Sequence, residues 1–99
     1  MKRFFFSESE RVTQVKEKSF SLGLLSKYGV EIVYKADEAD LVVVGSEEQY
    51  LALIHGQNEF RVFILVIDEG QMVSVKSKTL VVSCFNCAAQ AVITFAKAQ

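Results

Sequence analysis

Two cysteines three residues apart, in the segment Cys84-Phe85-Asn86-Cys87, are the residues of the chain best suited to chemistry. The segment lies between an apolar run that predicts a strand and a helical pattern, and the free N–H groups at the start of a helix stabilise a thiolate. The pair could therefore exchange thiols and disulfides. It could also supply two of the four ligands of a zinc site, but the single histidine, His55, lies in a different predicted helix, so a complete site would need a dimer.

A structural role for the cysteines competes with both functions. Free cysteine is among the residues most often buried in protein cores, where it packs as a small apolar side chain. We therefore expect Cys84 and Cys87 to be buried, and the alternative is a small thiol redox or metal-binding protein that uses this pair.

A second group of polar residues lies where predicted strands end: Ser7, Glu8, Ser46, Asp68 and Ser83. Open parallel sheets bind ligands at the carboxyl ends of their strands, and a helix that begins there attracts anions. These residues could form a crevice for a phosphate or a nucleotide, as in a carrier or transferase domain. Serine is equally the usual N-cap at such a junction, and no glycine-rich loop follows the first strand, so capping is the expected role.

Five apolar runs predict the strands that position these groups. Four are nearly continuous and rich in Val, Ile and Phe, a pattern typical of strands buried on both faces, whereas the fifth mixes apolar and polar residues. The four run from Arg3 to Phe6, Leu41 to Val44, Arg61 to Ile67 and Thr79 to Val82, and the fifth runs from Val30 to Tyr34. A further segment, Met72 to Lys76, alternates like an exposed edge strand, although an irregular crossover would also fit there.

Three helical patterns separate the strands. The first opens on the capping box Ser7 to Glu10 and continues to Gly29, the second opens on the capping box Ser46 to Gln49 and ends near Gly56, and the third is capped by Asn86 and runs to about Lys97. Strands that alternate with helices predict right-handed crossovers and a layered α/β domain. Residues 1–99 are therefore expected to form a single three-layer, flavodoxin-like domain, with a mostly parallel five-stranded sheet and three helices.

Composition excludes several classes of protein. The 99 residues are 51% hydrophobic and 23% charged with a formal net charge of -1, which fits neither a disordered chain nor the basic surface that nucleic acid needs. The start of the chain imitates a signal peptide, but Ser7 ends its apolar run, and no run approaches the roughly 20 apolar residues that span a bilayer. We therefore expect a cytoplasmic protein without nucleic-acid or membrane partners, and no cofactor is indicated.

The order of these segments resembles the receiver domain of response regulators. The resemblance rests on the strand Arg3 to Phe6, the helix to Gly29, the strand from Val30, the run Ala39 to Val44 and, above all, Val82 to Asn86 before the last helix. Receivers typically carry Lys-Pro-Phe before that helix, and Ser83-Cys84-Phe85-Asn86 looks like its altered counterpart. The resemblance implies that the first and last helices share one face of the sheet.

The same resemblance implies a receiver that cannot be phosphorylated. Receivers need an acidic pair after the first strand, an aspartate ending the third, a Ser or Thr ending the fourth and a lysine ending the fifth. These positions fall on Ser7-Glu8, Gly45, Asp68 and Ser83, so only Glu8 keeps a suitable carboxylate and Mg²⁺ finds few oxygen ligands. The segment around Gly45 also resembles the kinases that phosphorylate NAD, but it lacks their Gly-Gly-Asp-Gly signature.

The last predicted helix is apolar around most of its circumference, which is typical of a helix that packs on more than one neighbour. Only one short helix is predicted for the opposite face of the sheet, so we expect a partner to cover apolar surface, with Phe85, Val92 and Phe95 at the interface. The favoured hypothesis is a non-catalytic, regulatory protein-interaction module that forms a homodimer or binds another protein. The thiol protein is the alternative, and a domain that binds a phosphorylated ligand is the third hypothesis.

Overall fold

The computed structural model describes residues 2–23, 25–55, 63–67 and 78–98 of the chain. They form the elements β1 (Lys2–Phe6), α1 (Glu10–Gly23), the 3-10 turn η1 (Leu25–Tyr28), β2 (Val30–Ile32), the 3-10 turn η2 (Ala36–Glu38), β3 (Leu41–Val44), α2 (Glu47–Ile54), β4 (Phe63–Ile67), β5 (Thr79–Val82) and α3 (Phe85–Lys97). The segment Met72 to Lys76, for which an edge strand or a crossover was predicted, lies outside the described residues.

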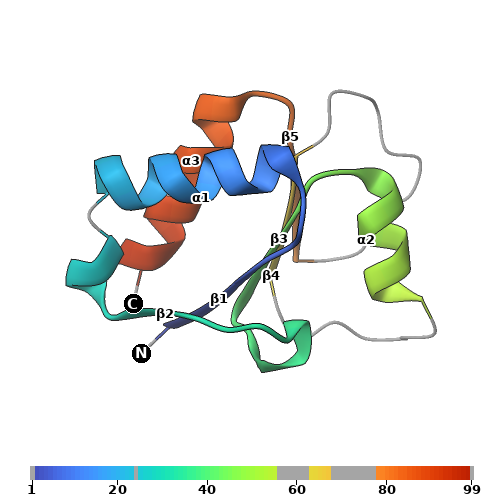
Figure 1. Ribbon diagram of the computed structural model, residues 1–99, viewed down its shortest axis with the longest axis horizontal. Helices are drawn as coiled ribbons and strands as arrows, with labels where there is room; N and C mark the ends of the chain where they lie inside the picture. Colours follow the sequence, from blue (N-terminus) through green and yellow to red (C-terminus); the bar gives the residue numbers. More distant parts are fainter. Residues whose placement is uncertain (1, 24, 56–62, 68–77, 99) are drawn as a thin grey trace.

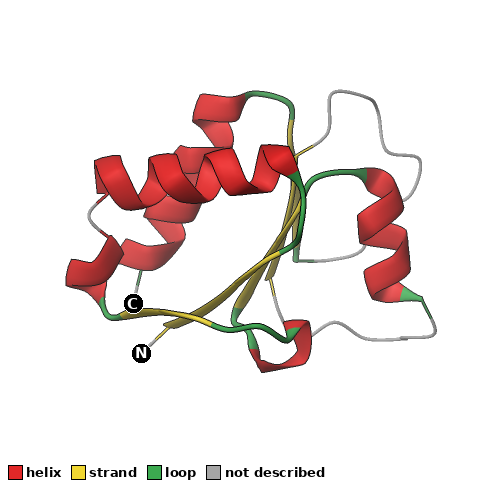
Figure 2. Cartoon of the chain, in the orientation of Figure 1, coloured by secondary structure: helices red, strands yellow, loops and turns green. Residues whose placement is uncertain are grey.

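All five described strands run parallel, in the order β2-β1-β3-β4-β5. Parallel neighbours must be joined by crossovers, which here place helices on both faces of the sheet (Figures 1 and 2). This order is that of the flavodoxin-like sheets, in which ligands bind where the strand order reverses, here between β1 and β3. The predicted three-layer α/β fold is confirmed, with a sheet that is parallel throughout its described strands.

The two faces of the sheet bury separate apolar cores. Side chains alternate along each strand, so Leu41 and Val43 of β3 pack with residues of α1 and α3, whereas Val42 and Val44 pack with α2. Tyr50 is the residue of α2 that is fully buried in this second core. The first and last helices therefore share one face of the sheet, as predicted.

The first helix starts later and ends earlier than predicted. Ser9, rather than Ser7, caps α1, because its hydroxyl accepts a hydrogen bond from the Val12 N–H at 3.1 Å. The α-helix ends at Gly23, and the predicted end at Gly29 instead follows the η1 turn. Gly29 has a φ of +70°, a left-handed conformation that a residue without a Cβ adopts readily.

The two other helices differ in how well their starts were predicted. Ser46 caps α2 as predicted, and its hydroxyl accepts from the Gln49 N–H at 3.1 Å. The third helix begins at Phe85 with Cys84 as its N-cap, so the prediction that Asn86 caps it is wrong by two residues. Among the described residues, no helix is both long enough and apolar enough to cross a bilayer.

The edge strand β5 is less buried than predicted. Its four residues, Thr79–Val82, were expected to be buried on both faces, but Leu80 exposes 53% of its surface and the other three are only half-buried. The fully buried side chains of α3 pack in the first core with residues of β1, β3 and β4, and Leu80 lies outside that core. A strand at the edge of a sheet has a neighbour on one side only, so its outer surface stays accessible.

Candidate functional site

The two cysteines lie at the carboxyl end of β5, where α3 begins. Cys84 precedes the helix with extended backbone dihedrals (φ -101°, ψ 130°), and its sulfur accepts a hydrogen bond from the Cys87 N–H at 3.4 Å. Both side chains are exposed and both thiols are free. The prediction that they are buried is wrong, because Cys84 and Cys87 belong to neither core, although Phe85 and Ala88 beside them pack in or against the first core.

Hydrogen bonds around the Cys84 sulfur lower the pKa of this thiol. The largest effect is the hydrogen bond from the Cys87 thiol. The N–H groups of Cys87 and Asn86 and the charge of Lys18 also lower the pKa, and together these effects outweigh desolvation, which raises it. The pKa of the Cys87 thiol is raised, mainly because ionisation would break its hydrogen bond to Cys84, with added effects of desolvation and of charge on Cys84. One cysteine is thus favoured as the thiolate and the other as the thiol.

Lys18 of α1 is held beside the thiol pair. Its ammonium donates a hydrogen bond to the side-chain oxygen of Asn86 and lies 5.4 Å from the centre of the Phe85 ring. The two residues between the cysteines therefore anchor a cation at the start of α3. This cation acts in the same direction as the helix N–H groups, which also favour a thiolate at Cys84.

The thiol pair supplies part of the ligand set that a metal centre needs. In the part of the chain that the structure describes, no three His, Cys, Asp or Glu side chains are grouped so that they could hold a metal ion. Two thiols are half of the ligand set of a structural zinc site. His55 is the exposed C-cap of α2, on the face of the sheet opposite to α3 (Figure 1).

Where the strand order reverses, the Gln49 side chain bridges the loops that follow β1 and β3. Its oxygen accepts hydrogen bonds from the Gly45 N–H at 2.7 Å and from the Ser7 hydroxyl at 3.0 Å, and its nitrogen donates to the Glu8 carbonyl at 3.2 Å. The Gly45 and Ser7 groups are donors that an anion would use in such a crevice. The sequence interpretation missed this role of Gln49, although the glutamine of the capping box was its signal.

The side chains of the other residues predicted for the crevice do not join the hydrogen bonds of the Gln49 side chain in the described part of the chain. The Ser46 hydroxyl is engaged by the first turn of α2. Glu8 and Ser83 are exposed, and Asp68 lies outside the described residues. The structure therefore brings Ser7 and the Glu8 backbone together around Gln49, with the crevice donors already bound to the protein's own side chain.

Gly45, at the end of β3, occupies a position without room for a side chain. A Cβ at this residue would come within 2.5 Å of the Ser9 hydroxyl oxygen and 3.3 Å of a Val12 methyl group. The amino end of α1 thus packs directly against the end of β3. An aspartate at this position, which the receiver resemblance aligns with the phosphoacceptor, would displace the residue that caps α1.

The residues predicted for a partner interface lie largely against the core of this chain. Val92 is fully buried, and Phe85 and Phe95 are half-buried against the same core. The centre of the Phe95 ring lies 5.7 Å from that of Phe4 and 5.2 Å from that of Phe63. Two neighbours of the apolar last helix are therefore the sheet and α1.

The resemblance to receiver domains stays a prediction that rests on the residues named above. No family model matches the sequence, and no curated protein is significantly similar to it.

Proposed function

We propose that the protein exchanges thiols and disulfides through Cys84 and Cys87. The observation that carries this proposal is the hydrogen bond from the Cys87 N–H to the Cys84 sulfur, 3.4 Å long, at the exposed start of α3. Reactive cysteines lie in accessible, electropositive surroundings such as helix N-termini, whereas structural cysteines are buried and inert. The Cys84 thiol combines exposure, helix N–H groups and the nearby Lys18 cation.

The unequal pKa values assign the two cysteines different steps. The Cys84 thiolate attacks one sulfur of a substrate disulfide, the substrate S–S bond breaks, and the departing thiolate takes up a proton. Cys87 then gives up its proton and attacks the Cys84 sulfur of the mixed disulfide, which releases the second substrate thiol. Two electrons pass to the substrate, which becomes two thiols while Cys84 and Cys87 form a disulfide. A dithiol reductant restores the two protein thiols.

Alkylation kinetics test the first step. Reaction with iodoacetamide over a range of pH, followed by peptide mass mapping, gives a separate rate for each cysteine. We expect Cys84 to react faster than Cys87 near neutral pH, because the thiolate is the nucleophile. Cys87→Ala is the matched control: it removes the thiol that donates to Cys84, so the reaction of Cys84 should move to higher pH. Equal rates at both cysteines would contradict the proposal.

Equilibration in glutathione buffers tests the second step. As the share of oxidised glutathione increases, the intact mass of the protein should fall by two hydrogens, whereas Cys87→Ser should retain glutathione on Cys84. Cys84→Ser keeps a hydroxyl at the N-cap, so the helix is preserved while both signals should disappear. A folded wild-type protein that never forms the intramolecular disulfide would overturn the proposal.

A second candidate function is regulation by protein binding, in a receiver-like module that is not phosphorylated. The packing at Gly45 favours the lack of phosphorylation, because a phosphoacceptor side chain there would meet the Ser9 hydroxyl at 2.5 Å. Incubation with acetyl phosphate should therefore add no phosphoryl group to the intact mass. Light scattering over a range of protein concentrations, in reductant, should show a homodimer. Phosphorylation would contradict the first expectation, and a strict monomer would contradict the second.

A further inference from the structure

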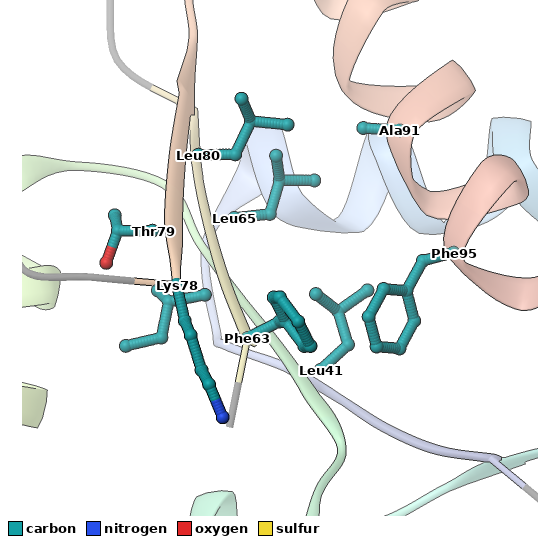
Figure 3. Close-up of a pocket in the computed structure, with 9 residues that line it drawn as sticks. Leu41, Phe63, Leu65, Lys78, Thr79, Leu80, Ala91 and Phe95 are labelled. Carbon is teal, nitrogen blue, oxygen red and sulfur yellow. The ribbon is translucent and has the colours of Figure 1, made fainter. Parts of the chain in front are cut away.

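A pocket of about 320 Å³ opens between the sheet and α3, at the amino ends of the strands and thus at the end opposite to the cysteines. Figure 3 shows Leu65 and Leu80 on neighbouring strands with Ala91 of α3 across from them, and the rings of Phe63 and Phe95 at the lower end. These side chains make the wall apolar. Concave, mostly apolar sites of roughly 300 Å³ or more are typical of small-molecule binding.

The pocket is open because the edge of the sheet is incompletely covered. Phe63 exposes 47% and Leu80 53% of their surface, although both are large apolar side chains. Leu80 lies on the edge strand, and of the two α3 side chains in the pocket wall, Ala91 and Phe95, Ala91 contributes only a methyl group. Neighbouring exposed apolar side chains at a concave surface indicate a binding site more often than chance.

One charged side chain lines the pocket in the described part of the chain, that of Lys78. Thr79 pairs with Ile64 in the register of β4 and β5, so Lys78 stands beside Phe63, and its ammonium lies 5.5 Å from the centre of the Phe63 ring. Lys78 has a φ of +63°, a left-handed conformation that is unfavourable for a residue with a Cβ. Its carbonyl accepts from the Ile64 N–H at 2.9 Å, which holds this conformation at the rim of the pocket.

We propose that this pocket binds a small amphipathic carboxylate, with its apolar part between the sheet and α3 and its carboxylate against Lys78. The volume admits roughly ten non-hydrogen atoms, since a water molecule takes about 30 Å³ of liquid. Lys2, whose ammonium lies 4.8 Å from the centre of the Phe95 ring, adds a second positive charge near the pocket wall. Charge complementarity therefore selects a carboxylate over an alcohol or an amine of the same length.

Octanoate, octanol and octylamine are matched probes, because they share one chain length and differ in the charge of the head group. Binding is followed by two-dimensional NMR and by the unfolding temperature of the full chain. We expect octanoate to shift the backbone signals of Leu80 and Ala91 and to raise the unfolding temperature, since a ligand that binds only the folded state stabilises it. Octanol should bind more weakly, and octylamine weakest of the three.

Substitutions separate the charge from the apolar space. Lys78→Met keeps an unbranched stem beside Phe63 and removes the charge, so octanoate should bind about three- to fivefold more weakly while octanol binding is unchanged. Ala91→Phe should fill the pocket and abolish binding of octanoate and octanol. If this variant does not fold, Ala91→Leu adds less volume and should also block the pocket. Ala91→Ser leaves the space open and should preserve binding.

Three outcomes would overturn the proposal. The first is equal binding of all three probes, and the second is octanoate binding that neither Lys78→Met nor Ala91→Leu weakens. The third is a dimer, detected by light scattering, that Ala91→Phe dissociates and to which octanoate does not bind, because a second copy of the chain would then cover this surface.

Discussion

The Tyr50 hydroxyl lies 3.2 Å from the Thr79 hydroxyl, and this contact connects the short helix α2 with the edge strand β5. Tyr50 is fully buried in the core between α2 and the sheet. A buried hydroxyl without a hydrogen-bond partner costs free energy, so the pair of hydroxyls favours this one placement of α2 against β5.

Tyr50→Phe should therefore lower the free energy of unfolding by about 0.5 to 1.5 kcal/mol, because it removes the hydrogen bond and keeps the ring. Denaturant unfolding measures the change. In a Thr79→Val background the same substitution should cost less, because one partner of the contact is already gone. Equal costs in the two backgrounds would mean that the two hydroxyls do not interact energetically.

Gly45→Ala should destabilise the protein by about 1 to 2 kcal/mol, since a Cβ at this position lies 2.5 Å from the Ser9 hydroxyl and would displace the cap of α1. Thermal or denaturant unfolding gives the value. The matched test is the same substitution in a Ser9→Ala background, where the hydroxyl is absent and the cost should fall. A cost that is unchanged in this background would place the strain elsewhere.

The local parts of this fold were predictable from the sequence, because they depend on neighbouring residues. Continuous apolar runs such as Leu41 to Val44 predict buried strands, and the serine at position 46 predicts the start of α2. The edge position of Thr79–Val82 was not predictable in this way. It depends on the order of the strands, which follows from crossovers that no short pattern encodes.

The sequence predicted which residues form the candidate site, but it did not predict their exposure or their hydrogen bonds. The pattern Cys-x-x-Cys identified Cys84 and Cys87, but their burial depended on where α3 begins, and that start was predicted two residues too late. Gln49 was missed because its hydrogen bonds to Ser7 and Glu8 cross more than 40 positions of sequence. Contacts of that range depend on the packing of whole elements.

The lowered pKa of Cys84 links the stability of the protein to pH. A thiol whose pKa is lower in the folded chain stabilises the fold above its unfolded pKa, about 8.5 for cysteine, and this contribution is lost as the pH falls through the folded-state pKa. The raised pKa of Cys87 has the opposite effect: its contribution is present below about 8.5 and is lost as the pH rises through its folded-state pKa.

We therefore expect Cys87→Ala to become more stable, relative to Cys84→Ser/Cys87→Ala, as the pH rises toward about 8.5. Ultraviolet absorbance of the thiolate supplies the direct titration. In the wild-type protein the first thiolate should appear at a lower pH than in Cys87→Ala, because the thiol that donates to Cys84 is intact. Identical titration curves for the two proteins would show that the Cys87 thiol does not stabilise the Cys84 thiolate.

At Lys78, two substitutions can separate the free-energy cost of the left-handed backbone from the contribution of the lysine side chain. Its φ of +63° is strained for any residue with a Cβ and relaxed for glycine. Lys78→Gly should therefore be more stable than Lys78→Ala by about 1 kcal/mol, since both variants lose the side chain beside Phe63 and only alanine keeps the strain. Denaturant unfolding of the two variants gives the difference.

Lys35 is the matched control, because it is also an exposed lysine outside the helices and strands but has an extended backbone with a φ of -130°. There the advantage of glycine over alanine should be smaller by about 1 kcal/mol, because Lys35, the N-cap of η2, has an extended backbone in which glycine relieves no strain. An equal difference at both positions would mean that the left-handed conformation carries no cost at Lys78. A larger advantage of glycine at Lys78 would show that the chain keeps a strained lysine at the rim of the pocket, beside the exposed Phe63 ring.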